Sequence, residues 1–152
     1  MKSERPQAPP FDNRQEIEAF LARPLLARLC SHNSDGSIHI APVYYLYENG
    51  EFLLGTQVRS LKARNVQRDR RVSLLIDAEE PVLQAVLVYG EAELDEQEVV
   101  EKRVRILERY YDTPDRARAF AEKLARAWKT VILHVRPTRM VTVDYSKLFS
   151  ID

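Results

Sequence analysis

The sequence contains one cysteine, Cys30, among 152 residues, so the chain cannot form an internal disulfide or a cysteine-rich zinc site. It also lacks an excess of either charge, because 23 Lys and Arg side chains balance 23 Asp and Glu side chains. That balance is not typical of a dedicated nucleic-acid or membrane binder. No apolar run approaches the roughly 20 residues of a membrane span, and the proline-rich N-terminus has no apolar signal core. We therefore expect a cytoplasmic protein.

Several signatures of catalysis are missing as well. The sequence shows no glycine-rich phosphate loop, no Ser–His–Asp order and no paired-carboxylate motif, so no catalytic acid or base is identified. His32 and His39 would lie opposite each other across a two-residue turn formed by Asp35 and Gly36. No third ligand shares their face, so we expect no metal site.

The apolar content of 45 % predicts one domain with a substantial core. Residues 1–12 hold three prolines and few apolar side chains, so we expect a flexible N-terminal arm followed by a single domain over 13–152. Strands are predicted at 25–32, 38–47, 51–56, 71–77 and 82–94, and a closing hairpin from 130 to 145. The first three of these strands are expected to form a meander.

Helices are predicted where capping residues precede amphipathic segments. Asn13, Ser60 and Thr113 are candidate N-caps, and a further helix is expected at about 95–111. Gly90 is a candidate bulge within its strand. Mostly antiparallel strands interrupted by helices predict a mainly β protein with helical insertions (α+β), built as a small β-barrel.

Six basic residues fall within positions 59–71, directly before a predicted strand. Lys62 lies in the first turn of the helix that Ser60 caps, where the backbone N–H groups are free, and Thr56 ends the preceding strand. Donors, a positive helix end and a lysine charge together suit a phosphate group. The alternative is a solvated helix whose arginines pair with the acidic segments 79–80 and 95–98, and we keep that interpretation for Arg68, Arg70 and Arg71.

Pro42 interrupts an apolar strand and cannot donate to a ladder, so it indicates a sheet edge or a bulge. Backbone groups beside it would be free for a flat polar ligand. Tyr45 and Tyr47 should project to one face of this strand and Tyr44 to the other. An aromatic barrel wall is an equally good interpretation of these tyrosines.

The order of these segments resembles the pyridoxamine 5′-phosphate oxidase-like, FMN-binding split-barrel family. The resemblance rests on residues 25–94: an Asp-Gly turn, a Pro-Val-aromatic strand, a threonine before the phosphate turn, the pattern Ser-x-Lys-x-x-Asn and the strand RRVSLLID. The segment 131–145 looks like the last two strands of that family. The resemblance implies a six- to seven-stranded antiparallel split β-barrel of Greek-key type. It also implies a homodimer with FMN held between its subunits.

The resemblance further implies which residues contact the cofactor. The flavin ring would be contacted by Ile40, Ala41, Pro42, Val43, Tyr44, Tyr45, Gly55, Thr56 and Gln84. The phosphate turn would comprise Ser60, Leu61 and Lys62, with Asn65 on the same helix. Family members often carry an Arg-Lys pair where this chain has Leu61 and Lys62, so Arg59 or Arg64 is expected to supply the second charge.

The function implied is that of an FMN-dependent oxidoreductase acting on an unknown small molecule. Vitamin B6 oxidation is not expected, because the chain ends at SKLFSID without the substrate-holding segment of the true oxidases. Two alternatives stay open: a reductase that uses the 5-deazaflavin coenzyme, and a non-catalytic flavin-binding module.

Overall fold

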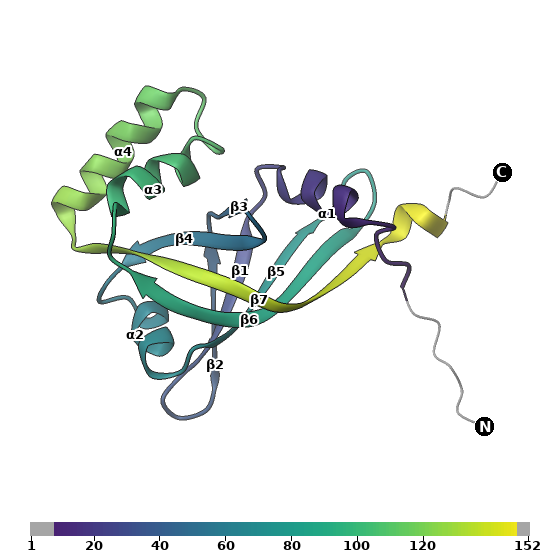
Figure 1. Cartoon of the computed structure of the whole chain (residues 1–152), viewed down its shortest axis with the longest axis horizontal. Coiled ribbons are helices and arrows are strands. Elements are labelled where there is room, and N and C mark those ends of the chain that lie inside the picture. The colour runs from purple at the N-terminus through teal and green to yellow at the C-terminus, as the bar shows by residue number, and fades with distance from the viewer. Residues whose placement is uncertain (1–7, 149–152) are drawn as a thin grey trace.

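A computed structural model describes residues 8–148, and all strands in this range belong to one antiparallel sheet in the order β2-β1-β5-β6-β7-β4-β3 (Figure 1). The strands are β1 (Ala27–His32), β2 (Ile38–Val43), β3 (Leu46–Glu48), β4 (Glu51–Gln57), β5 (Arg71–Ala78), β6 (Gln84–Asp95) and β7 (Thr130–Asp144). The helices are α1 (Arg14–Leu21), α2 (Leu61–Arg68), α3 (Val99–Leu107), α4 (Pro114–Ala127) and the 3-10 helix η1 (Tyr145–Leu148). The predicted mainly antiparallel split barrel with helical insertions is confirmed.

The sheet curls because of a very short connection between its two edges. Strands β2 and β3 lie at opposite ends of the strand order, yet only Tyr44 and Tyr45 join them. Such a link spans at most about 11 Å from Val43 to Leu46, so the two edges must approach each other. The prediction of a three-strand meander was wrong, because β2 pairs with β1 while β3 and β4 form a separate hairpin at the other edge.

The predicted closing hairpin is instead one continuous strand, β7. Its first half pairs with β4, and its whole length pairs with β6. The register shifts at Tyr89 and Gly90, where Thr138 of β7 is the extra residue of a bulge. Pro137 lies in this bulge, where a proline is tolerated, so β7 continues without a turn. A Cβ on Gly90 would lie 2.3 Å from the carbonyl oxygen of Arg136, so only glycine fits there. The predicted bulge at Gly90 is confirmed.

Helix capping follows the sequence closely. The side chains of Asn13, Ser60 and Thr113 accept from the backbone N–H of the third residue beyond each, as predicted for N-caps. Helix α3 is shorter than expected and covers Val99–Leu107. Figure 1 shows α3 and α4 together at one end of the sheet, and α1 with η1 at the opposite end.

The barrel and the α3–α4 pair each have a hydrophobic core of their own. The main core lies inside the curled sheet and under α1, with Tyr45, Phe52 and Leu29 fully buried. Helices α3 and α4 share a smaller core around Val104 and Ala121. Ile106 joins α3 to β4 and β7, so the helical pair is fixed over the end of the sheet.

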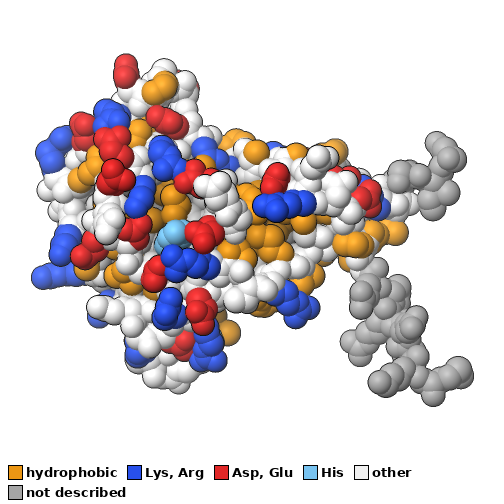
Figure 2. All heavy atoms as spheres, viewed as in Figure 1, with side chains coloured by type: hydrophobic (Ala, Val, Ile, Leu, Met, Phe, Trp, Pro, Cys, Tyr) orange, Lys and Arg blue, Asp and Glu red, His pale blue; other side chains and the backbone are white. Residues whose placement is uncertain are grey.

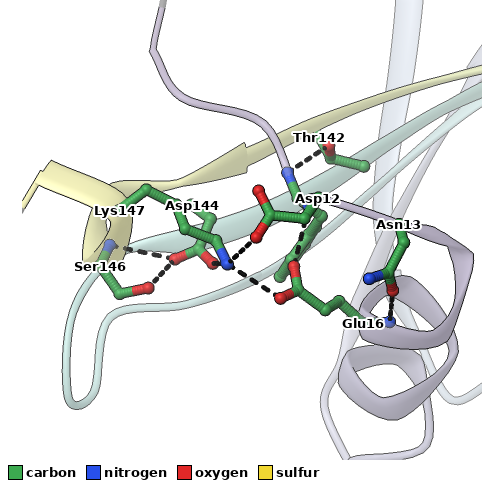
Figure 3. A network of polar contacts seen from close by, with 8 residues as sticks. Asp12, Asn13, Glu16, Thr142, Asp144, Ser146 and Lys147 are labelled. Atoms are coloured by element: carbon green, nitrogen blue, oxygen red, sulfur yellow. Dashed lines mark hydrogen bonds and ion pairs between the residues drawn. The ribbon is translucent and has the colours of Figure 1, made fainter. Parts of the chain in front are cut away.

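The segment before α1 is held on the sheet, unlike the expected arm over residues 1–12. Phe11 is buried against Phe20, and its backbone N–H donates to Oγ1 of Thr142 over 2.9 Å. Figure 3 shows Lys147 of η1 pointing between the carboxylates of Asp12 and Glu16, each 2.8 Å from its Nζ. Residues 1–7 of the predicted arm lie outside the described residues.

Surface ion pairs hold the end of the basic stretch, as expected for a solvated segment, although the partners differ. Arg71 pairs with Asp69 and Arg70 with Glu93, instead of the acidic segments 79–80 and 95–98. Arg68 donates to the carbonyl of His32. Figure 2 shows Lys and Arg side chains interleaved with Asp and Glu over the visible face. No helix within residues 8–148 is long and apolar enough to cross a membrane.

Candidate functional site

A cavity of about 290 Å³ opens where the ends of β2 and β4 meet helices α2, α3 and α4. Six of the predicted cofactor residues line it: Pro42, Val43, Tyr44, Gly55, Thr56 and Lys62. They come from three elements that are separate in the sequence, and the curl of the sheet brings them to one place. This cavity is therefore the candidate site.

Strand β2 offers a free edge to the cavity. Within residues 8–148 it pairs with β1 alone, and Pro42 on this edge is exposed. The predicted edge position of Pro42 is confirmed, since a residue without an N–H interrupts no ladder there. Tyr44 follows as an exposed residue whose ring lies 4.2 Å from that of Tyr110. Tyr45 turns the opposite way, as predicted, and is buried in the core.

The beginning of α2 is fixed by a cap that joins it to the end of β4. Ser60 caps the helix by accepting from the N–H of Ala63 over 3.2 Å, and Thr56 donates its hydroxyl to the Ser60 oxygen over 3.0 Å. Thr56 therefore reaches the turn from the end of β4. The Ala63 N–H is taken up by this cap, whereas the N–H groups of Leu61 and Lys62 have no acceptor within the helix and are available to an anion.

Two cations face the same cavity from different helices. Lys62 of α2 and Arg103 of α3 both line it, and neither makes an ion pair with a carboxylate within residues 8–148. Burial lowers the pKa of Lys62, and the nearby charge of Arg103 lowers it further. Burial also lowers the pKa of Arg103. Two partly desolvated cations without a counter-charge form an electrostatic site for an anion.

Arg103 was not anticipated from the sequence. The second charge beside Lys62 was expected from Arg59 or Arg64, but Arg59 lines a neighbouring hollow and Arg64 lines another with Asn33. Arg103 instead donates through Nη1 to the carbonyl of Thr56 over 3.4 Å. The sequence did contain a sign of this role, because Arg103 is a charged residue on the otherwise apolar face of α3.

The α3–α4 pair also lines the cavity with apolar side chains that were not predicted to belong to the site. These residues are Ile106, Leu107, Phe120 and Leu124. The cavity therefore combines a cationic end with an apolar wall, as sites for amphipathic ligands do.

Three predicted residues on and after β2 lie outside the cavity. Ile40 is exposed at 62 % on the outer face of the sheet, and Ala41 points inward. Tyr45 is fully buried, and its hydroxyl donates to the carbonyl of Leu21 over 2.9 Å. Their contact with a cofactor stays a prediction.

The remaining predicted residues are placed elsewhere in the chain. Asn65 is buried, and its amide donates to Ser31 and Asn33 over 3.1 and 2.9 Å, so it ties α2 to the end of β1. Leu61 lines the hollow around Arg64. Gln84 lies at the opposite end of the sheet, beside Lys147 and α1. A single chain does not bring these residues into the cavity.

The predicted facing of two histidines was wrong. His39 pairs with Ser31, and His32 pairs with Ile38, because the connection is a three-residue turn closed between Asn33 and Ser37. Neighbouring residues of a strand point to opposite faces, so this shift separates the two rings. Within residues 8–148 no group of three His, Cys, Asp or Glu side chains is arranged to hold a metal ion.

The fold and the cavity define a split-barrel protein with a cavity lined by two cations at one end of its sheet. A sequence model described as pyridoxamine 5′-phosphate oxidase matches residues 14–144, and the chain therefore belongs to the pyridoxamine 5′-phosphate oxidase family. The predicted resemblance is confirmed. Comparison with curated proteins gives no match.

Solved structures of similar fold extend this assignment. The conserved hypothetical protein Rv2991 from Mycobacterium tuberculosis is 27 % identical with a TM-score of 0.81, over 97 % of this chain and 94 % of that one. An F420 reductase is 20 % identical with a TM-score of 0.65, over 81 % and 94 %. A FAD-binding protein from Mesorhizobium loti is 17 % identical with a TM-score of 0.60, over 86 % and 93 %. The last two show similarity of fold.

Proposed function

We propose that this protein is an FMN-binding flavoprotein and an oxidoreductase for a small molecule, with the flavin held in the cavity between β2, β4 and α3. The observation that carries the proposal is the pair of unpaired cations, Lys62 and Arg103, at one apolar-walled cavity. FMN has the matching chemistry, since it joins a flat ring system to a phosphate. Membership of the family supports the same ligand class.

The phosphate would bind at the start of α2. The first-turn N–H groups point outward from the Ser60 cap, and Lys62 adds a positive charge in the same turn. Arg103 reaches the region from α3, where its hydrogen bond to Thr56 orients it. These groups would supply charge-assisted hydrogen bonds to an anion, which are stronger than neutral ones.

The flavin ring would lie along the strand ends. Pro42 and Val43 present little side-chain bulk, which suits a flat ring, and the Arg103 guanidinium that covers Gly55 would face the ring from the other side. Ile106 and Leu107 would cover apolar parts of the ligand and exclude water. When bound, the flavin supplies the hydride chemistry, whereas the chain binds and orients it.

A homodimer is part of the proposal, because the cavity is open and the outer sheet face is apolar. Leu75, Leu87 and Val141 align in one row across β5, β6 and β7 on this outer face. Ile38 and Ile40 on β2 are both exposed at 62 %. A second copy packed on this face would bury these side chains and complete the enclosure of a cofactor.

The test is the absorption spectrum of the purified protein together with mass spectrometry of the released ligand. A flavin is expected, with visible bands close to those of free FMN. The 5-deazaflavin coenzyme is the second candidate, favoured by the basic residues near α2 and by the fold shared with the F420 reductase. The spectrum of the 5-deazaflavin coenzyme differs from that of FMN. If the protein releases a deazaflavin, this coenzyme takes the place of FMN as the assigned ligand. A protein that neither carries nor takes up either molecule would contradict both.

A further inference from the structure

A second hollow of about 340 Å³ adjoins the flavin cavity along two chain segments. It is lined by Gln57, Val58, Arg59, Ala127, Trp128 and Lys129. Gln57 lines both spaces, and the end of α4 runs from Leu124 at the first to its C-cap residue, Trp128, at the second. The shared residue and the shared chain segment place the two hollows next to each other.

The chemistry of this second hollow is aromatic and cationic. The indole of Trp128 is 50 % exposed, although tryptophan is usually well buried. Arg59 makes no ion pair or side-chain hydrogen bond within residues 8–148, and Lys129 has only a 3.9 Å contact with Glu96. The N–H of Val58 donates to the carbonyl of Lys129 over 2.9 Å, which fixes the two walls together. A planar ring carrying an anionic group matches this surface.

The hollow lies at the phosphate end of the flavin cavity. Arg59 directly precedes Ser60, the N-cap of the turn where we place the phosphate. A ligand that fills the second hollow therefore continues beyond that phosphate and away from the ring.

We propose that this hollow is a subsite for the adenosine diphosphate half of a dinucleotide, so that the site holds FAD more tightly than FMN. The adenine would stack on Trp128, while Arg59 and Lys129 would face the phosphates. This inference rests on the proposed flavin site and extends its ligand from a mononucleotide to a dinucleotide.

The experiment uses the single tryptophan of the chain, whose fluorescence reports a flavin bound in or beside this hollow. The full-length protein, freed of ligand, is titrated with FMN and with FAD. The dissociation constant for FAD is expected to be at least tenfold below that for FMN. In Trp128→Ala, binding is measured by flavin fluorescence. This variant should have a dissociation constant for FAD as high as that for FMN, and its FMN binding should be unchanged. Trp128→Phe should retain the preference, because it keeps an aromatic face.

Arginine variants separate a specific contact from general charge. Arg59→Ala should weaken FAD binding several-fold, whereas Arg126→Ala, which removes another exposed arginine from the last turn of α4, should not. Equal affinities of the native protein for FMN and FAD would overturn the proposal. An equal loss for both flavins in Trp128→Ala would also overturn it.

Failure of the flavin site itself gives a different result. Lys62→Ala should weaken FMN and FAD alike, which tests the first cavity without involving the second. If neither flavin binds, titration with ADP tests the proposed subsite by itself. Quenching of Trp128 fluorescence that is lost in Arg59→Ala supports the subsite, and the absence of quenching overturns it. Triglutamate is the control, because it carries negative charge but no planar ring. If it quenches Trp128 as strongly as ADP does, the hollow only attracts anions, and the proposal is overturned.

Discussion

The guanidinium group of Arg103 lies against the backbone of Gly55, so closely that a Cβ on Gly55 would be 2.9 Å from Nε of the arginine. Gly55 lies within β4 opposite Ile132, in ordinary strand geometry. Glycine is therefore needed here for the space it leaves to a side chain from α3. The relationship links the predicted cofactor strand to the cation that the sequence did not reveal.

Gly55→Ala is expected to displace Arg103 and to weaken FMN binding about as much as Arg103→Ala does. The clash involves a flexible side chain, so the fold should persist with little change in melting temperature. Isothermal titration and thermal unfolding check the two parts. Unchanged FMN affinity in Gly55→Ala would show that the position of Arg103 does not matter to the ligand.

Lys62→Ala should weaken FMN binding far more than Arg70→Ala. A charge-assisted hydrogen bond is worth roughly 1.5 to 3 kcal/mol, so the dissociation constant should rise about tenfold to 150-fold. Arg70 is an exposed residue with a 3.5 Å ion pair to Glu93, which makes it a suitable control. Riboflavin lacks the phosphate, so its affinity should hardly respond to Lys62→Ala. Equal losses for FMN and riboflavin would place the phosphate elsewhere.

FMN binding should depend on pH through Lys62. Burial and the charge of Arg103 lower the pKa of this lysine, so the empty site disfavours its charge, whereas a bound phosphate favours it. Affinity should therefore fall as pH rises through the depressed pKa, beginning below the ordinary value of 10.5. The unliganded protein should gain stability over the same window, because its folded state binds this proton less tightly than the unfolded chain.

Two variants test this assignment. Lys62→Arg should keep its FMN affinity to higher pH, since the guanidinium does not lose its proton in that range. Dissociation constants measured from neutral to alkaline pH provide the comparison. A Lys62→Ala profile with the same alkaline fall as the native protein would assign the effect to another group.

Arg109→Ala is expected to destabilise the fold, although Arg109 does not line the cavity. Its Nη2 donates to the carbonyls of Leu21 and Arg23, each over 2.8 Å, and its guanidinium lies 4.4 Å above the ring of Tyr45. Loss of this clamp should cost about 2 kcal/mol of unfolding free energy, or about 4 to 8 °C in melting temperature. The exposed Arg116→Ala provides the control and should change little. A melting temperature within 1 to 2 °C of the native one, by roughly the same scale, would contradict the clamp.

The outer face of β5 and β6 is expected to form the subunit interface. Light scattering of the native protein should give about twice the chain mass of 17.7 kDa. Leu87→Glu places a charge between Leu75 and Val141 in the middle of that face and should yield monomers, because burying an unpaired carboxylate is unfavourable. Leu148→Glu, at an exposed leucine of η1, should leave the dimer intact. A dimeric Leu87→Glu protein would exclude this face.

Local features of the fold were predictable because neighbouring residues determine them. The N-caps at Asn13, Ser60 and Thr113 depend on a side chain and an N–H three residues away. Pro42 indicated a sheet edge, since it lacks the donor that a central strand requires. Gly90 indicated a bulge in its strand, although the extra residue, Thr138, belongs to the partner strand β7.

Only the tertiary structure decided which distant segments meet. Strand β7 is continuous because β4 and β6 both pair with it, although its proline resembled a turn signal. Arg103 reaches Thr56 across 47 residues of chain, and no periodicity within either segment encodes that contact. The sequence by itself determined the caps, the edge and the basic turn at Lys62. The second cation required the docking of α3 on the sheet, because packing between elements depends on the summed shape of many side chains.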